Sequence, residues 1–204
     1  MKPDNELNRL QKEAEENREP DHEIDLIFIH RWSPRALGRD MDEEELKSLF
    51  EAARWAPSSY NNQSWRFIYT TYEDEQFSEF VDLLGEFNAD WAEPGYALIV
   101  IVSKTTFDHN GEESITHSFD TGAAWQNLAL EAARRGLVAH GMQGFDYEKA
   151  REKLDIPEEY EVEAMVAVGS QEDESKLPEE AQVKPNGRKD LSQIASRGEF
   201  SFES

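Results

Sequence analysis

The sequence contains no cysteine, and this absence removes three kinds of chemistry together. Without cysteine there is no disulfide framework, no thiolate metal site and no cysteine nucleophile. Basic residues are scarce as well: 21 Lys and Arg stand against 44 Asp and Glu among 204 residues, for a formal net charge of -23. Long-range repulsion from such a charge opposes nonspecific binding to nucleic acid and to anionic membranes. We therefore expect neither as a partner.

Long hydrophobic runs are also missing. The longest apolar run, Tyr96 to Val102, is far shorter than the roughly 20 residues that a helix needs to span a bilayer. The first 20 residues are polar and contain no apolar segment of the kind found in signal peptides. We expect a cytoplasmic protein. The acidic excess is typical of a protein surface adapted to high salt, where screening relieves the self-repulsion.

Several common catalytic motifs do not occur. The chain has no GxGxxG after a strand, no GxxxxGK[ST] and no GxSxG, so the usual dinucleotide, P-loop and hydrolase signatures are absent. Its five histidines form no HExxH motif, and we expect no metal site.

Helical and strand patterns alternate along the chain, which indicates a layered α/β or α+β domain with its strands in the middle. We divide the chain into a polar, acidic N-terminal arm, residues 1–22, and a single domain, residues 23–204. A helix in the arm is not expected to contribute to the core. Helices are predicted at residues 5–18, 24–30, 42 to near 57, 75–84, 120–136 and after 146, and strands at 65–70, 97–102, 137–142 and 162–168.

Four polar segments at the ends of these elements draw attention: RWSPR at 31–35, APSSYNNQSW at 56–65, MQGFD at 142–146 and NGRKDL at 186–191. In the first and last, arginines stand beside Ser, Gly or Asn rather than among carboxylates. This composition suits phosphate, which accepts charge-assisted bonds from Arg and neutral bonds from hydroxyl and N–H groups. From composition alone, ion pairs of Arg31 and Arg35 with nearby carboxylates explain the first segment equally well.

Taken in order, the four segments resemble the nitroreductase family of FMN-dependent oxidoreductases. The first fits the family's pattern of Arg, Ser and a second basic residue at alternate positions. The second fits the signature A-P-S-x-x-N-x-Q-P-W, with Ser64 in place of the second proline. An Ala-rich helix ending in QNLALEAARRGL, then GMQGFD, then a late basic residue follow in the family's order. The resemblance covers about residues 24–191.

This resemblance implies an α+β fold with three layers, α-β-α, and a central, mainly antiparallel sheet. It also implies an interlocked homodimer with two FMN sites at the interface, each built from both chains. The implied phosphate contacts are Arg31, Ser33, Arg35, Arg188 and Lys189, with Trp32 contributing through its backbone. The other subunit would supply Pro57, Ser58 and Asn61.

At the flavin ring, the resemblance implies Asn88 at the pyrimidine edge and Gln143 and Gly144 over the ring, with the Gly144 N–H near N5. Trp91 falls near the place where the family often has Lys or Arg. Tyr60 and Trp91, in loops that flank the implied site, are candidates for the acceptor pocket. Trp55 and Trp125 are expected in core or dimer packing, and His140 is expected to be a hydrogen-bonded structural histidine.

The activity implied by the resemblance is hydride transfer from NADH or NADPH, through flavin N5, to a small conjugated acceptor such as a nitroaromatic or a quinone. The kinetics would be ping-pong, and no obligate general acid, base or nucleophile is needed because flavin supplies the electrons. Two alternatives stay open: a specialised flavin reaction such as reductive dehalogenation, and a non-catalytic FMN-binding or interaction protein.

Overall fold

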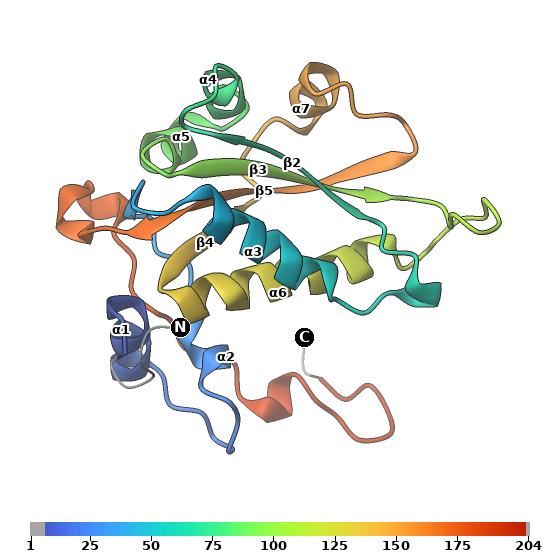
Figure 1. The fold of residues 1–204 in the computed structure, drawn as a ribbon. Coiled ribbons are helices and arrows are strands. Elements are labelled where there is room, and N and C mark those ends of the chain that lie inside the picture. The colour runs from blue at the N-terminus through green and yellow to red at the C-terminus, as the bar shows by residue number, and fades with distance from the viewer. Residues whose placement is uncertain (1–6, 203–204) are drawn as a thin grey trace.

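The computed structural model describes residues 7–202, and within them one five-stranded sheet forms the centre of the molecule (Figure 1). Strand β5 pairs with β3 on one edge and β4 on the other, β2 pairs with β3, and the short β1 pairs with the end of β5. Every pairing is antiparallel, which confirms the predicted kind of sheet. The strands are β1 (Leu37–Gly38), β2 (Trp65–Thr71), β3 (Ala97–Lys104), β4 (Leu137–Met142) and β5 (Tyr160–Gln171).

Helices cover both faces of this sheet and confirm the three-layer arrangement (Figure 1). One face carries α3 (Glu43–Arg54) and α6 (His117–Arg135), and the other carries α4 (Phe77–Val81), α5 (Glu86–Ala92) and α7 (Tyr147–Lys153). Helices α1 (Arg9–Asn17) and α2 (Ile27–His30) lie on the α6 side. Short 3-10 turns are η1 (Ser59–Asn61), η2 (Glu174–Lys176), η3 (Glu179–Ala181) and η4 (Leu191–Gln193).

Strand β3 shows why the chain folds into layers. Its run of apolar residues is buried on both faces, as expected for a strand covered by helices on either side. Because side chains alternate along a strand, Leu98, Val100 and Val102 enter one core cluster while Ile99 and Ile101 enter the other. The first cluster includes Phe77, Phe80 and Trp91, and the second includes Leu46, Leu49 and Leu128.

Local signals set several helix ends as predicted. At the start of α3, the Asp42 carboxylate accepts a hydrogen bond from the Glu45 N–H at 2.8 Å, and the Glu45 carboxylate accepts one from the Asp42 N–H at 3.3 Å. This is the reciprocal capping box. Asp146 caps α7 through the Lys149 N–H at 2.9 Å. Helix α6 stops at Gly136, whose φ of 77° places it in the left-handed region.

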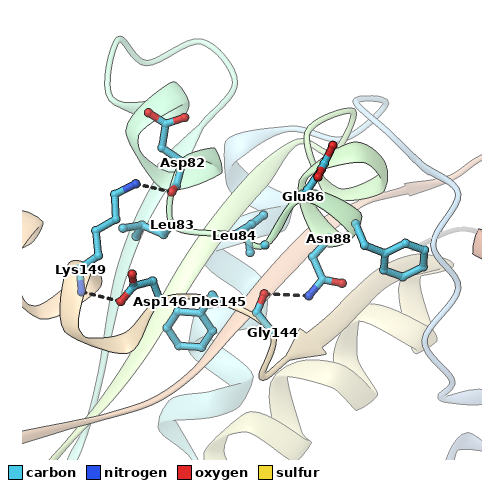
Figure 2. A pocket seen from close by; sticks show the side chains of 11 residues that line it. Asp82, Leu83, Leu84, Glu86, Asn88, Gly144, Phe145, Asp146 and Lys149 are labelled. Carbon is cyan, nitrogen blue, oxygen red and sulfur yellow. Dashed lines mark hydrogen bonds between the residues drawn. The ribbon is translucent and has the colours of Figure 1, made fainter.

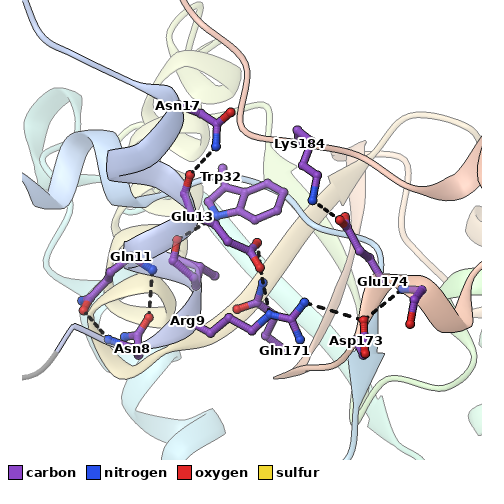
Figure 3. A network of polar contacts seen from close by, with 12 residues as sticks. Asn8, Arg9, Gln11, Glu13, Asn17, Trp32, Gln171, Asp173, Glu174 and Lys184 are labelled. Carbon is purple, nitrogen blue, oxygen red and sulfur yellow. Dashed lines mark hydrogen bonds and ion pairs between the residues drawn. The ribbon is translucent and has the colours of Figure 1, made fainter.

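The N-terminal helix differs from its prediction. Leu10 and Ala14 of α1 are 1% and 0% exposed and belong to the same core cluster as Trp32. The Trp32 indole N–H donates to the Leu10 carbonyl at 3.1 Å, and the Gln171 amide donates to Glu13 at 3.1 Å (Figure 3). The expectation that this helix does not contribute to the core is therefore wrong. Its two apolar residues, four apart, share one face and pack onto the domain.

The segment predicted as one helix from residue 75 to 84 is also different. Helix α4 ends at Val81, and a second short helix, α5, begins after Gly85, whose backbone is extended (φ -66°, ψ 149°). Glycine is a poor residue for a helix interior but is accepted at the N-cap. Asn88 and Trp91 consequently lie on a helix rather than in a loop.

Candidate functional site

Three arginines from opposite ends of the chain, Arg18, Arg31 and Arg188, lie close enough to repel one another. Burial, and then the charges of Arg188 and Arg31, lower the pKa of Arg18 to about 10. Burial, and then the charge of Arg188, also lower the pKa of Arg31. Held together without a counterion, such groups destabilise the charged state, so the cluster favours binding of an anion.

In the described part of the chain, no carboxylate forms an ion pair with this cluster. Within residues 7–202, no ion pair shorter than 4 Å involves Arg18, Arg31, Arg35 or Arg188. The alternative reading of RWSPR, in which its arginines pair with neighbouring acids, is therefore not found. In a chain with a net charge of -23, the arginines are kept apart from the many available carboxylates.

Arg31 opens onto a cavity of about 360 Å³ whose lining also includes Ser33 and Gln143. The Arg31 guanidinium donates to the Ser33 hydroxyl at 3.3 Å. Trp125 and Glu163 line the same cavity and were not predicted as site residues. Glu163 does not pair with Arg31; its Oε1 accepts hydrogen bonds from Ser103 and Ser118, each at 2.5 Å.

A second, larger cavity of about 650 Å³ lies between the α4–α5 segment and the loop before α7 (Figure 2). There the Asn88 side-chain amide donates to the Gly144 carbonyl at 2.9 Å, and the Gly85 N–H donates to the same carbonyl at 3.1 Å. The Gly144 N–H donates no hydrogen bond within the described part of the chain. A methyl group at Gly144 would stand 2.5 Å from Asn88 Nδ2, so a larger residue here would require the Asn88 side chain to move.

Two tryptophans of the predicted set point into the protein. The Trp91 side chain is 1% exposed and its indole N–H donates to Asn88 Oδ1 at 3.2 Å. The prediction that Trp91 lies in a loop flanking the site is wrong, because it lies on α5 and packs in the core. Trp32 is 4% exposed and faces α1, which leaves its backbone as the part able to contact a ligand. The Arg35 guanidinium lies 5.9 Å from the Trp91 ring and 5.0 Å from that of Phe87.

His140 is a structural residue, as predicted. Its Nδ1 donates to the Pro34 carbonyl at 2.9 Å, and its ring lies 4.4 Å from that of Trp91. Burial lowers the pKa of His140 to about 4, and the charges of Arg35 and Arg31 act in the same direction. The imidazole is therefore neutral at pH 7 and adds no positive charge to the arginines.

The loop after α3 holds an unusual backbone. Tyr60, Asn61 and Gln63 have φ of 53°, 54° and 51°, and non-glycine residues in this left-handed region cost roughly 1 kcal/mol or more each. The buried Asp120 at the start of α6 accepts a hydrogen bond from the Ser59 N–H at 3.0 Å and thereby helps to hold the loop. Strain that is maintained in this way is common at ligand sites.

We expect Asp120→Ala to destabilise the protein by about 1 to 3 kcal/mol, because the Ser59 N–H and the Thr116 hydroxyl both lose their acceptor. Urea unfolding followed by circular dichroism measures the change. The matched control is Asp108→Ala, which removes an exposed carboxylate paired with Lys104 and should cost little. Equal stabilities of the two variants would contradict a role for Asp120 in holding the loop.

Within this single chain, five of the predicted site residues line the two cavities. Arg31, Ser33 and Gln143 share the smaller cavity, and Asn88 and Gly144 share the larger one. The loop between β4 and α7 borders both. The remaining predicted residues line neither cavity: Trp32, Arg35, Pro57, Ser58, Tyr60, Asn61, Trp91, Arg188 and Lys189.

Arg18 is the functional candidate that sequence reasoning missed. It stands among acidic residues in the stretch EENREPD, where no pattern distinguishes it from a surface residue. Groups of three acidic, His or Cys side chains able to hold a metal ion are not found in residues 7–202, and none of the helices there is long and apolar enough to cross a membrane.

Comparison with known proteins finds one matching protein family and several similar proteins. The sequence model of the nitroreductase family matches residues 29–170. A crystal structure of an oxidoreductase containing FMN is 41% identical and superposes with a TM-score of 0.87, covering 91% of this chain and 97% of the other. An uncharacterised 15.4 kDa protein of Mycolicibacterium smegmatis is 33% identical, over 62% of this chain and 86% of its own. An oxygen-insensitive NADPH nitroreductase of Helicobacter acinonychis is 40% identical over 29% of this chain and 28% of its own.

Proposed function

Because the chain belongs to the nitroreductase family and is a flavin oxidoreductase of that family, we propose that it uses FMN to pass a hydride from NADH or NADPH to a small conjugated acceptor. Nitroaromatics and quinones are the acceptors that this chemistry serves. The similar structure that contains FMN and the relative named as an NADPH nitroreductase support the cofactor and the reductant. The order of events is ping-pong, with oxidised nicotinamide leaving before the acceptor enters.

The observation that carries the proposal is the arginine cluster, for which residues 7–202 supply no carboxylate partner. The terminal phosphate of FMN is a dianion that accepts several charge-assisted hydrogen bonds. Arg31 and Arg188 would hold this phosphate, with the Ser33 hydroxyl as a neutral donor beside Arg31. Burial, and then the charge of Arg188, lower the pKa of Arg31, and phosphate in this place would offset both by pairing with its charge.

Asn88 and Gly144 are suited to the edge of the flavin ring. The Asn88 amide nitrogen donates one hydrogen bond to the Gly144 carbonyl, and its oxygen accepts one from the Trp91 indole N–H. An amide side chain has two N–H groups and two oxygen lone pairs, so one of each remains. Asn88 can therefore offer one donor and one acceptor to a pyrimidine edge. The Gly144 N–H, which has no partner in residues 7–202, is the donor we assign to flavin N5.

Bound FMN would supply the redox chemistry, which is hydride transfer between the reductant and the acceptor. The protein then needs to bind the cofactor, orient the substrates on it and shield the site from water. No side chain has to transfer a proton as an obligate acid or base. The neutral His140 agrees with this, because its Nδ1 proton is held by the Pro34 carbonyl.

We further propose that the protein is a homodimer in which the loop at residues 57–61 completes the site of the other subunit. The loop lines neither cavity of its own chain. Near it, Tyr60, Ile115 and Phe119 are 81%, 85% and 81% exposed, a concentration of large apolar side chains that favours an interface.

The proposal is tested by adding FMN to the purified protein and then NADH or NADPH without oxygen. We expect one FMN per chain to bind and its yellow absorbance to bleach with a reductant and return when a quinone is added. A protein that takes up no FMN contradicts the proposal entirely. Binding without bleaching by either reductant would identify an FMN-binding protein that is not an oxidoreductase.

A further inference from the structure

Arg18 stands directly after α1, and its guanidinium reaches two distant parts of the chain. Nε donates to the Asn186 carbonyl at 2.8 Å, and Nη2 donates to the Asn186 side-chain oxygen at 3.1 Å. Nη1 donates to the carbonyls of Ile29 and Arg31 at 2.8 and 2.9 Å. One side chain therefore joins the end of α1, the turn that carries Arg31 and the C-terminal segment that carries Arg188.

The donors of Arg18 are nearly all occupied by protein acceptors. A guanidinium has five N–H groups in a planar fork, and four of them make the hydrogen bonds just described. Little donor capacity remains for a ligand. The positive charge of Arg18 lies near the arginine cluster, but its hydrogen bonds hold the backbone around that cluster.

The C-terminal segment depends on these bonds. In the described part of the chain, Arg18 is the donor of every hydrogen bond that joins residues 186–202 to the rest of the protein. No ion pair does so among the same residues. Asn186, which Arg18 holds, also accepts weak hydrogen bonds from the Arg188 guanidinium at 3.3 and 3.4 Å.

We infer that Arg18 is a positioning residue that holds Arg188 beside Arg31, so that the two can bind one phosphate group. This inference rests on the proposed function, and it gives the N-terminal arm a role in cofactor binding. Arg18 and Asn186 both lie outside residues 29–170, the part of the chain that the family model matches. The clamp therefore joins segments that flank the matched region to its first residues, Ile29 and Arg31.

The test compares the dissociation constants of FMN and riboflavin, which lacks the phosphate, in phosphate-free buffer. Arg18→Gln should raise the dissociation constant for FMN about tenfold or more, the scale of lost hydrogen bonds to a charged group. Riboflavin binding should change less than about twofold, because no phosphate is involved. Arg18→Lys should behave like the Gln variant, since an ammonium group cannot span four acceptors in a planar fork.

A double-mutant cycle shows whether Arg18 acts through Arg188. In the Arg188→Ala background, adding Arg18→Gln should change the FMN dissociation constant less than about threefold. The control is Lys12→Gln, which removes the same charge from an exposed position on α1 and should leave FMN binding unchanged. If Arg18→Gln unfolds the protein, Asn186→Ala removes the exposed acceptor instead and should also weaken FMN selectively.

The inference is overturned if Arg18→Gln binds FMN as tightly as the Lys12 control, if riboflavin binding falls equally, or if Arg18→Lys restores wild-type affinity. Additive effects in the double-mutant cycle would also overturn it. Failure of the proposed function looks different: wild-type protein would then show no preference for FMN over riboflavin.

Discussion

Replacing Arg31 by alanine should weaken FMN binding by about 1.5 to 3 kcal/mol, the value of a charge-assisted hydrogen bond. The dissociation constant then rises about ten- to hundredfold, and riboflavin binding changes far less. Fluorescence titration of both flavins measures the difference. Arg31 carries no ion pair in residues 7–202 that could compensate, and it lines the smaller cavity beside Ser33.

The same substitution should not lower the stability of the protein without flavin. Burial, and then the charge of Arg188, lower the pKa of Arg31, so the folded state loses a buried charge and a repulsion when Arg31 is removed. Loss of affinity without loss of stability is the signature expected of a binding residue. The matched control is Arg197→Ala, at an exposed position of the C-terminal segment. Wild-type affinity for FMN in the Arg31 variant would refute its phosphate role.

Leu10→Ala should destabilise the protein by about 2 to 5 kcal/mol, the range for large-to-small changes at buried leucines. Leu10 is 1% exposed and packs in the core cluster that contains Trp32. Its carbonyl accepts a hydrogen bond from the Trp32 indole N–H. Chemical unfolding in urea measures the loss. Because α1 ends next to Arg18, partial loosening of this helix should also reduce FMN affinity.

Leu7→Ala is the control for this variant, since Leu7 is 37% exposed and lies close by in the sequence. Its cost should stay within about 0.5 kcal/mol, as at most surface sites. If both leucines cost the same small amount, α1 is not an integral part of the core and the original prediction of a peripheral arm is correct.

Local physical signals account for the parts of the fold that could be predicted. The capping carboxylate of Asp42 acts over three residues, and the left-handed conformation at Gly136 is a property of one residue. The apolar run of β3 indicates a strand covered on both faces before any partner is known. The resemblance to the family predicted the fold, and three residues that it implies as cofactor contacts, Arg31, Ser33 and Gln143, line one cavity.

The parts that could not be predicted depend on distant contacts. Trp32 is buried because α1 packs over it, and nothing between residues 30 and 35 encodes that contact. Trp91 turns inward because Gly85 starts a new helix, which changes the direction of every side chain after it. The proposed role of Arg18 depends on its hydrogen bonds to Asn186, 168 residues away in sequence. Periodicity and motif spacing carry no information at that range.

The Arg18–Asn186 contact also has a consequence for the order in which the protein is made. The two partners are separated by 168 residues, and ribosomes add about 5 to 20 residues per second. Arg18 is therefore added to the chain roughly 10 to 30 seconds before Asn186. During that time Arg188 is still missing, and β5, the strand with which β1, β3 and β4 pair, is added only shortly before it. Cofactor capture through the phosphate must wait until the C-terminal segment has been synthesised, so a nascent chain cannot hold flavin tightly until its synthesis is nearly complete.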